Sequence, residues 1–329
     1  MSQTFPVTGS VELAVVERSG FVESRHAGAA IVLAPDGSVV EKLGDTSALV
    51  LPRSSLKPVQ ALACLTAGAE LDGERLGLAT ASHSGTDRHV AVVRDILTTA
   101  GVGEDDLGCP EAWPTDPASR AEMVRELQSP ARIRMNCSGK HAAMLAATVA
   151  NGWDAASYLD INHPLQMHIR EIIERLTGEK LTTSAIDGCG APVYPMTLFG
   201  LARAIHRIGT SSTTSPFALH RNAAALVQTV REHPWTIAGP GQPDTVVAER
   251  LGVFAKGGAE GVMVMVAPNG TTVALKILDG SGRAASVVGL RLLERAGALS
   301  ASDVAEASSG LSLSVSGGGT PVGAIRPAF

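Results

Sequence analysis

Strand patterns occur near both ends of the chain, and this arrangement limits the folds that the sequence can adopt. Residues 11–20 and 26–45 are rich in apolar residues, and a Pro-Asp-Gly turn in the second range predicts a β-hairpin. Residues 260–280 alternate around an Ala-Pro-Asn-Gly turn and predict a second hairpin. The order predicts an α/β (α+β) fold, in which both chain ends build one antiparallel sheet and a helical lobe is inserted between them.

Helix patterns fill the middle of the chain. The clearest is an apolar stripe within residues 162–178, formed by Leu165, Ile169, Ile172, Ile173 and Leu176. Other helices are predicted within residues 50–68, 86–101, 109–128, 137–152, 193–209, 217–233 and 282–299, and the tail 316–329 is predicted to be one strand. We expect a single catalytic domain over residues 1–329, with a sheet lobe (about 1–60 and 250–329) and a helical middle (about 61–249).

Composition excludes several classes of partner. The net charge is −5 and only 3% of residues are aromatic, which disfavours a nucleic-acid-binding surface. The N-terminus shows no signal-peptide pattern and no apolar run approaches the roughly 20 residues of a membrane helix, so we expect a cytoplasmic protein. In that compartment the four cysteines are expected to be buried thiols, metal ligands or reactive thiols rather than disulfides.

A Ser-x-x-Lys motif opens the apolar run of residues 50–68, with Ser54 and Lys57 as its ends. On a helix this spacing places both side chains on one face, where a lysine of lowered pKa can take the proton of a serine nucleophile. The alternative is a plain helix start with capping hydroxyls, and Ser55 can supply the cap in either interpretation. The motif alone does not decide between these two interpretations.

Two further segments fit the catalytic interpretation. Ser82 lies in a stretch of small hydroxyl residues and glycine, where it could relay protons. Lys256 precedes Gly257 and Gly258, and a Lys-x-Gly element at the mouth of a strand is the third part of the β-lactamase pattern. Three such elements in the right order are much less expected by chance than one.

A second group of residues has metal-ligand character. Cys137, Lys140 and Cys189 are candidate ligands, although Cys-x-x-Lys is not a familiar zinc pattern and lysine must lose its proton to bind. From chemistry alone two buried free thiols are favoured. The neighbouring polar residues that could hold a small zwitterion are Asn136, His141 and Asp187.

The chain resembles the Rhizobium-type L-asparaginase II family over nearly its whole length. The resemblance rests on the segments RSSLKPVQ, ASHSG, NCSGKHAAML, NHPLQ, DGCGAPVYP, AGPGQPDT, AKGGAEG and ILDGSGRA. It implies a fold similar to serine β-lactamases and glutaminases, hydrolysis of L-asparagine to L-aspartate and ammonia, and a homodimer.

The resemblance also implies a role for each matched residue. Ser54 with Lys57 and Ser82 with Lys256 correspond to two serine–lysine pairs, and the order in which the serines act stays open. Arg53 and Asp187 correspond to polar active-site groups, and Asn136 and His141 to their neighbours in the pocket. Cys137, Lys140 and Cys189 correspond to the ligands of a zinc ion beside the serines.

Two positions depart from the family pattern. Cys109 is followed by Pro110 with no Gly or His, and Gly190 stands where a Ser is common. We expect the segment after Cys109 to border the pocket and to affect substrate preference.

Other functions fit some of these residues. A glutaminase, a β-lactamase or an esterase would use the same Ser-x-x-Lys, Ser and Lys-x-Gly elements. A non-catalytic amino-acid sensor would keep the pocket but would not need two serine–lysine pairs. A thiol enzyme using Cys137 or Cys189 would need an orienting histidine, for which the sequence shows no pattern.

Overall fold

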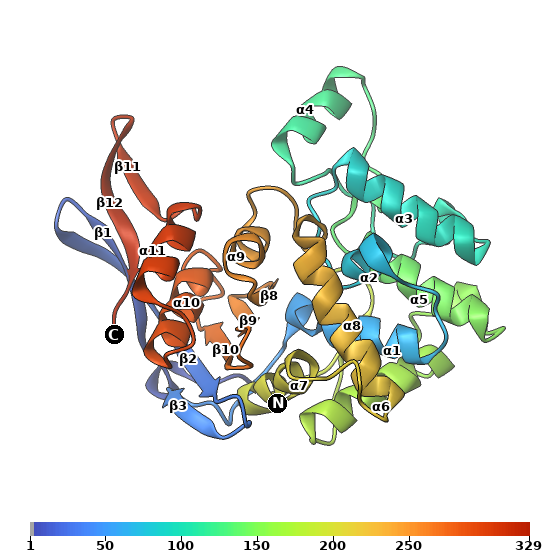
Figure 1. Cartoon of the computed structure of the whole chain (residues 1–329). Coiled ribbons are helices and arrows are strands. Elements are labelled where there is room, and N and C mark those ends of the chain that lie inside the picture. The colour runs from blue at the N-terminus through green and yellow to red at the C-terminus, as the bar shows by residue number, and fades with distance from the viewer. Residues whose placement is uncertain (1–2) are drawn as a thin grey trace.

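A computed structural model describes residues 3–329 and contains one large antiparallel sheet (Figure 1). Its strands, in spatial order, are β11 (Ser314–Gly317), β12 (Thr320–Pro327), β1 (Val11–Arg18), β2 (Phe21–Leu33), β10 (Thr272–Ile277), β9 (Val262–Val266) and β8 (Phe254–Gly258), and β3 (Val39–Leu43) pairs with part of β2. N-terminal and C-terminal strands alternate at two places, because β1 pairs with β12 and β2 pairs with β10. The predicted sheet from both chain ends is therefore confirmed.

The helical layer follows the sequence periodicity closely. The helices of the middle region are α1 (Lys57–Thr66), α2 (Gly73–Ala79), α3 (Asp87–Ala100), α4 (Pro117–Arg125), α5 (Ser138–Ala150), α6 (Pro164–Thr177), α7 (Leu198–Gly209), α8 (Ala218–Glu232) and α9 (Pro243–Leu251). Thr86 caps α3 through a hydrogen bond from His89 N, and Gly101 ends that helix in a left-handed conformation. Short two-residue strands, β4 (Leu49–Val50), β5 (Ala185–Ile186), β6 (Pro192–Val193) and β7 (Met196–Thr197), connect this layer.

The sheet is covered on both faces, which explains its apolar central strands. On β9, Val262, Val264 and Val266 face the helical layer, where α7 packs on the sheet. Met263 and Met265 face the opposite side, which α10 (Ala285–Arg295) and α11 (Ala301–Ser309) cover. Every residue of β9 and β10 is buried as a result. Figure 1 shows α10 and α11 on the side of the sheet away from the main helical layer.

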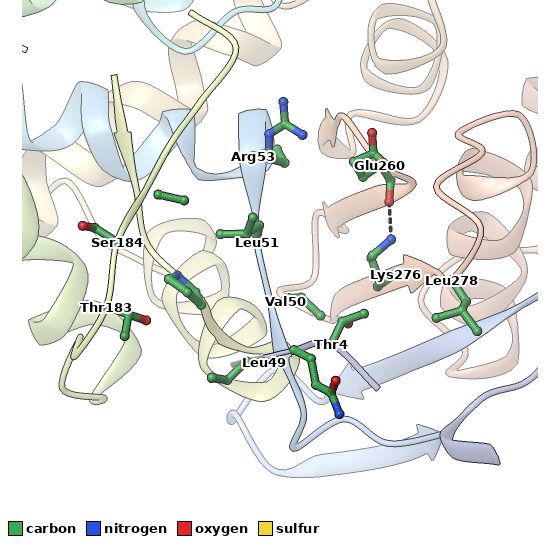
Figure 2. A pocket seen from close by; sticks show the side chains of 13 residues that line it. Thr4, Leu49, Val50, Leu51, Arg53, Thr183, Ser184, Glu260, Lys276 and Leu278 are labelled. Carbon is green, nitrogen blue, oxygen red and sulfur yellow. Dashed lines mark hydrogen bonds between the residues drawn. The ribbon is translucent and has the colours of Figure 1, made fainter. Parts of the chain in front are cut away.

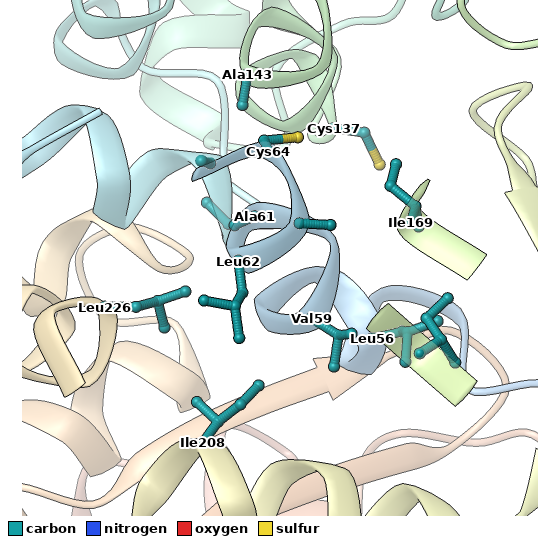
Figure 3. Close-up of a cluster of buried hydrophobic side chains, with 14 of the residues drawn as sticks. Leu56, Val59, Ala61, Leu62, Cys64, Cys137, Ala143, Ile169, Ile208 and Leu226 are labelled. Atoms are coloured by element: carbon teal, nitrogen blue, oxygen red, sulfur yellow. The ribbon is translucent and has the colours of Figure 1, made fainter. Parts of the chain in front are cut away.

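Helix α1 lies at the centre of the helical layer (Figure 3). It packs against α5, α6, α7 and α8, and its residues from Lys57 to Cys64 are all buried. Leu56, Val59 and Leu62 direct apolar side chains into this core. A lysine at the first position of such a helix is consequently removed from water together with its apolar neighbours.

Two predictions of local structure are wrong, one for the C-terminal tail and one for the position of Lys256 in its strand. The tail is not one strand but a hairpin, β11–β12, whose turn places Gly318 and Gly319 at positive φ. Lys256 does not lie at the mouth of a strand but inside β8, an edge strand of the sheet. Within residues 3–329, no helix is both long and apolar enough to cross a membrane.

Gly28 is expected to be essential to the pairing of the two chain ends. A Cβ at this position would lie 2.2 Å from the Lys276 carbonyl oxygen and 2.9 Å from Leu13 Cδ1. Gly28→Ala should therefore destabilise the protein by about 1–3 kcal/mol through overpacking, measured by denaturant unfolding. Gly103→Ala is the control, because its Cβ would meet only Asp106 Oδ2 at 3.8 Å. Equal unfolding midpoints for the two variants would contradict this view of the sheet.

Candidate active site

Ser54 precedes helix α1 and lies in a 3-10 turn over Arg53–Leu56. The predicted capping role of Ser55 is wrong, because its hydroxyl donates to the Pro52 carbonyl (2.7 Å) and no side chain caps α1. Ser54 is half-buried, and within residues 3–329 its hydroxyl makes no hydrogen bond. Ser54 and Lys57 are therefore close in sequence but are not hydrogen-bonded to each other.

Lys57 instead reaches Ser82. Its side chain is 1% exposed, and Nζ donates to Ser82 Oγ (3.0 Å), to the Ala81 carbonyl and, at 3.4 Å, to the Asn136 carbonyl. These bonds place the amine beneath the loop that follows α2. Lys57 therefore pairs with the second of the two serines that the sequence singled out.

Lys256 reaches the same hydroxyl from the sheet. Nζ donates to Ser82 Oγ (2.9 Å) and to the Gly257 carbonyl (2.7 Å), and the side chain is fully buried. Burial lowers the pKa of Lys256 to about 8, although Asp244, 3.7 Å away, acts in the opposite direction. Ser82 Oγ thus lies between two lysine amines, one of which can lose its proton near neutral pH.

A cavity of about 340 Å³ opens onto these groups. It is lined by Ser54, Ser82, Asn136, Lys256 and the glycines of β8, and also by Gln242, Pro243 and Asp244 at the start of α9. Sequence reasoning missed Asp244, since an acidic residue in the first turn of a helix is an ordinary feature. The cavity can hold a small substrate with both serines and Lys256 in reach.

Arg53 and Asp187 form an ion pair next to Ser54. Arg53 Nε donates to Asp187 Oδ1 (2.7 Å), and both side chains are largely buried. Burial alone would raise the pKa of Asp187, but the hydrogen bonds from Arg53 and Gly188 N and the charge of Lys140 lower it below its usual value. The pair therefore presents both charges of a zwitterion-binding site.

The predicted metal ligands are brought together in the interior. Lys140 Nζ donates to Cys189 Sγ (3.0 Å), and Cys137 Sγ donates to Asn136 Oδ1 (3.2 Å). A hydrogen bond with Cys189 lowers the pKa of Cys137 well below its usual value, against its burial and with help from Lys57 and Lys140. The thiols of this cluster are free.

This donor set fits a zinc ion in part. Two sulfurs and one amine converge, which are soft and borderline donors of the kind that zinc accepts. Within the described residues no group of three or more His, Cys, Asp or Glu side chains could hold a metal, so a site here has to use the lysine. Burial lowers the pKa of Lys140, but the two neighbouring thiols raise it above its usual value, so metal binding has to displace its proton.

Two other expected positions lie away from the cavity. His141 is fully buried, and its Nδ1 contacts the Tyr158 hydroxyl (2.6 Å). Cys109 is also buried, donates to the Arg132 carbonyl (3.5 Å) and does not line the cavity. Gly190 has a φ of 89°, a conformation in which a side chain is strained, so glycine suits this position better than serine.

A family comparison identifies the chain. A model of the L-asparaginase II family matches residues 14–327. The chain belongs to the L-asparaginase II family. The resemblance seen in the sequence is thereby confirmed, while no curated protein matches the chain.

Solved structures with a similar fold have low identity to this asparaginase-family chain. The glutamate form of Mglu is 13% identical with a TM-score of 0.45, over 82% of this chain and 60% of that chain. A Bacillus glutaminase is 14% identical with a TM-score of 0.35, over 83% of this chain and 92% of that chain. The chain also covers 64% of native Mglu, so it spans less than two thirds of both forms.

A larger cavity, of about 510 Å³, is lined by Arg53 (Figure 2). Leu49, Leu51 and Thr183 line it, together with Lys276, whose amine donates to the Glu260 carbonyl (2.6 Å). It contains neither serine of the proposed pairs, so the smaller cavity is the better candidate for the reaction.

Gly258 is expected to control the distance between β8 and the serine turn. A Cβ here would lie 2.7 Å from the Pro52 carbonyl oxygen and 3.3 Å from Ser54 N. Gly258→Ala should displace the strand and lower the family's amidohydrolase turnover about a hundredfold, since misplacement by about 1 Å can cost that much. Gly282→Ala lines the same cavity and its Cβ meets nothing within 4 Å, so this control should keep its rate. Equal kcat values would refute this role.

Proposed function

We propose that this protein hydrolyses L-asparagine to L-aspartate and ammonia through an acyl-enzyme. Membership of the L-asparaginase II family supports an amidohydrolase. The observation that carries the proposal is the Ser82 hydroxyl, held between two buried lysine amines in a cavity that also contains Ser54. A serine needs such a proton acceptor nearby to become a nucleophile.

In the proposed reaction Ser54 Oγ attacks the side-chain amide carbon of asparagine. Its proton passes to Ser82 Oγ, whose own proton goes to Lys256 Nζ. Lys256 suits this role because burial lowers its pKa to about 8, so a useful fraction is neutral near physiological pH. Lys57 is bonded to Ser82 and to two backbone carbonyls, and we assign it to holding Ser82 in place.

The proton then returns along the same path. Lys256 gives it through Ser82 to the amide nitrogen, the C–N bond breaks, and ammonia leaves an aspartyl ester on Ser54. Water attacks this ester and transfers a proton through Ser82 to Lys256. The proton finally goes to Ser54 Oγ as the ester bond breaks, which releases aspartate and restores the resting enzyme.

The charged pair beside Ser54 would bind the zwitterionic end of the substrate. Within residues 3–329 Arg53 bonds to Asp187 through Nε alone, so its terminal amino groups could bind the α-carboxylate, and Asp187 would accept from the α-ammonium group. Asn136 borders the cavity that contains Ser54 and Ser82, whereas Arg53 lines the larger neighbouring cavity. His141 supports this region from the core through Tyr158 rather than from the cavity.

We also propose that the protein binds zinc and forms a homodimer. Cys137, Lys140 and Cys189 would hold the ion, which would supply positive charge beside the bound substrate. The proposal of a homodimer rests on the family resemblance alone.

Ammonia release from L-asparagine tests the function directly. The wild type should release ammonia, and Ser54→Ala should lower kcat by about 10⁴-fold or more, because no acyl-enzyme can form. Rapid quenching followed by peptide mass spectrometry should locate the aspartyl adduct on Ser54.

L-glutamine, a β-lactam and an ester serve as comparison substrates. Faster turnover of any of them would favour the corresponding glutaminase, β-lactamase or esterase. An adduct on Ser82 would reverse the roles of the two serines. A ligand-induced melting shift without release would indicate a sensor.

Zinc content tests the metal proposal. Protein purified with added zinc should hold about one ion per chain, and Cys189→Ala should lose most of it, since a site loses affinity with each ligand. Cys109→Ala is the matched control, because its buried thiol contacts the Arg132 carbonyl instead. Equal zinc content in the two variants, measured by elemental analysis, would remove the ligand assignment.

A further inference from the structure

Asp244 occupies a position that links helix α9 to the edge strand of the sheet. It is the second residue of the helix, and its side chain is 10% exposed. Oδ2 accepts a hydrogen bond from Gly257 N (2.8 Å) and lies 3.7 Å from Lys256 Nζ. One carboxylate oxygen thus contacts both the backbone next to Lys256 and the amine of Lys256 itself.

Gly257 suits the contact with the Asp244 carboxylate. A Cβ there would lie 3.3 Å and 3.4 Å from the two carboxylate oxygens of Asp244. These distances are tighter than ordinary van der Waals contact, so glycine lets the carboxylate lie against the strand. The carboxylate then fixes the stretch of backbone whose carbonyl also accepts from Lys256 (2.7 Å).

The distances around Lys256 distinguish its hydrogen-bond partners from its charged neighbour Asp244. The amine makes its hydrogen bonds to Ser82 and to the Gly257 carbonyl, while the carboxylate stands farther off. Asp244 therefore acts on the amine by charge without taking the place of Ser82. The other ionisable groups that act on Lys256 are Lys57, which opposes a second positive charge, and Cys137, which favours it when ionised.

We propose that Asp244 is the positioning residue of the catalytic base: its carboxylate holds the β8 backbone so that Lys256 meets Ser82, and it faces the Lys256 amine from 3.7 Å. This inference rests on the proposed function in taking Lys256 as the base. Removing the charge should make Lys256 a weaker base that is neutral at lower pH.

The test compares Asp244→Asn with the wild type by the pH dependence of kcat on L-asparagine. The wild-type rate should rise as Lys256 loses its proton near pH 8. In Asp244→Asn this rise should move about one unit toward lower pH, as expected for a charge removed from within 4–6 Å. KM should stay within about twofold, because a positioning residue acts on turnover rather than on binding.

Asp303→Asn is the matched control. Asp303 also lies in the first turn of a helix, α11, but does not line the cavity, and the profile of this variant should be that of the wild type. Asp244→Glu should restore the position of the wild-type rise at least in part. If Asp244→Asn raises KM but its kcat rises at the wild-type pH, Asp244 is a substrate-binding residue. If neither KM nor the pH dependence of kcat changes, its role is purely structural. Either result overturns the proposal.

A titration without substrate separates this inference from the proposed function. The ¹⁵N resonance of Lys256 Nζ, assigned by its loss in Lys256→Arg, should titrate about one unit lower in Asp244→Asn than in the wild type. If neither protein hydrolyses asparagine, the proposed function fails while this shift still supports the charge role of Asp244. An unmoved titration overturns the inference even if hydrolysis is observed.

Discussion

The site depends on the removal of two lysine amines from water and on their convergence at one hydroxyl. Burial disfavours a charged amine, so each one needs acceptors in the interior. Lys57 finds backbone carbonyls, and Lys256 finds Ser82, the Gly257 carbonyl and the charge of Asp244. The two amines come from a helix and from a strand of opposite halves of the chain. The convergence of the two amines is therefore a property of the tertiary structure, because it forms only when the sheet has brought β8 to the start of α1.

Close packing of α5 against α2 brings the thiol cluster near the two lysines. Gly139 lies in the first turn of α5, and a Cβ there would be 2.5 Å from the Leu78 carbonyl oxygen. The absence of a side chain lets α5 approach α2, which places Asn136 and Cys137 beside Lys57. The lysines and the thiols consequently influence one another's protonation, and a change of charge in one group is transmitted to the other.

Local patterns predicted the elements better than they predicted the contacts between them. The stripe of residues 162–178 became the buried face of α6, because periodicity alone determines which side of a helix is apolar. The order of motifs selected Ser54, Lys57, Ser82 and Lys256, and three of these four do meet. The pairing of Lys57 with Ser82 rather than Ser54 depends on distances across the fold, which sequence spacing does not contain. Strand β8 was hard to recognise because Gly257 and Gly258 are poor β-formers.

The position of Lys256 on an edge strand has a consequence for solubility. A free sheet edge exposes backbone N–H and C=O groups that can recruit a strand from another chain. At Gly257 both groups are already occupied, the N–H by Asp244 and the C=O by Lys256. Asp244 and Lys256, which line the cavity together with Ser82, therefore also close the sheet edge at this point. Contacts that position the proposed base therefore also protect the sheet against edge-to-edge aggregation.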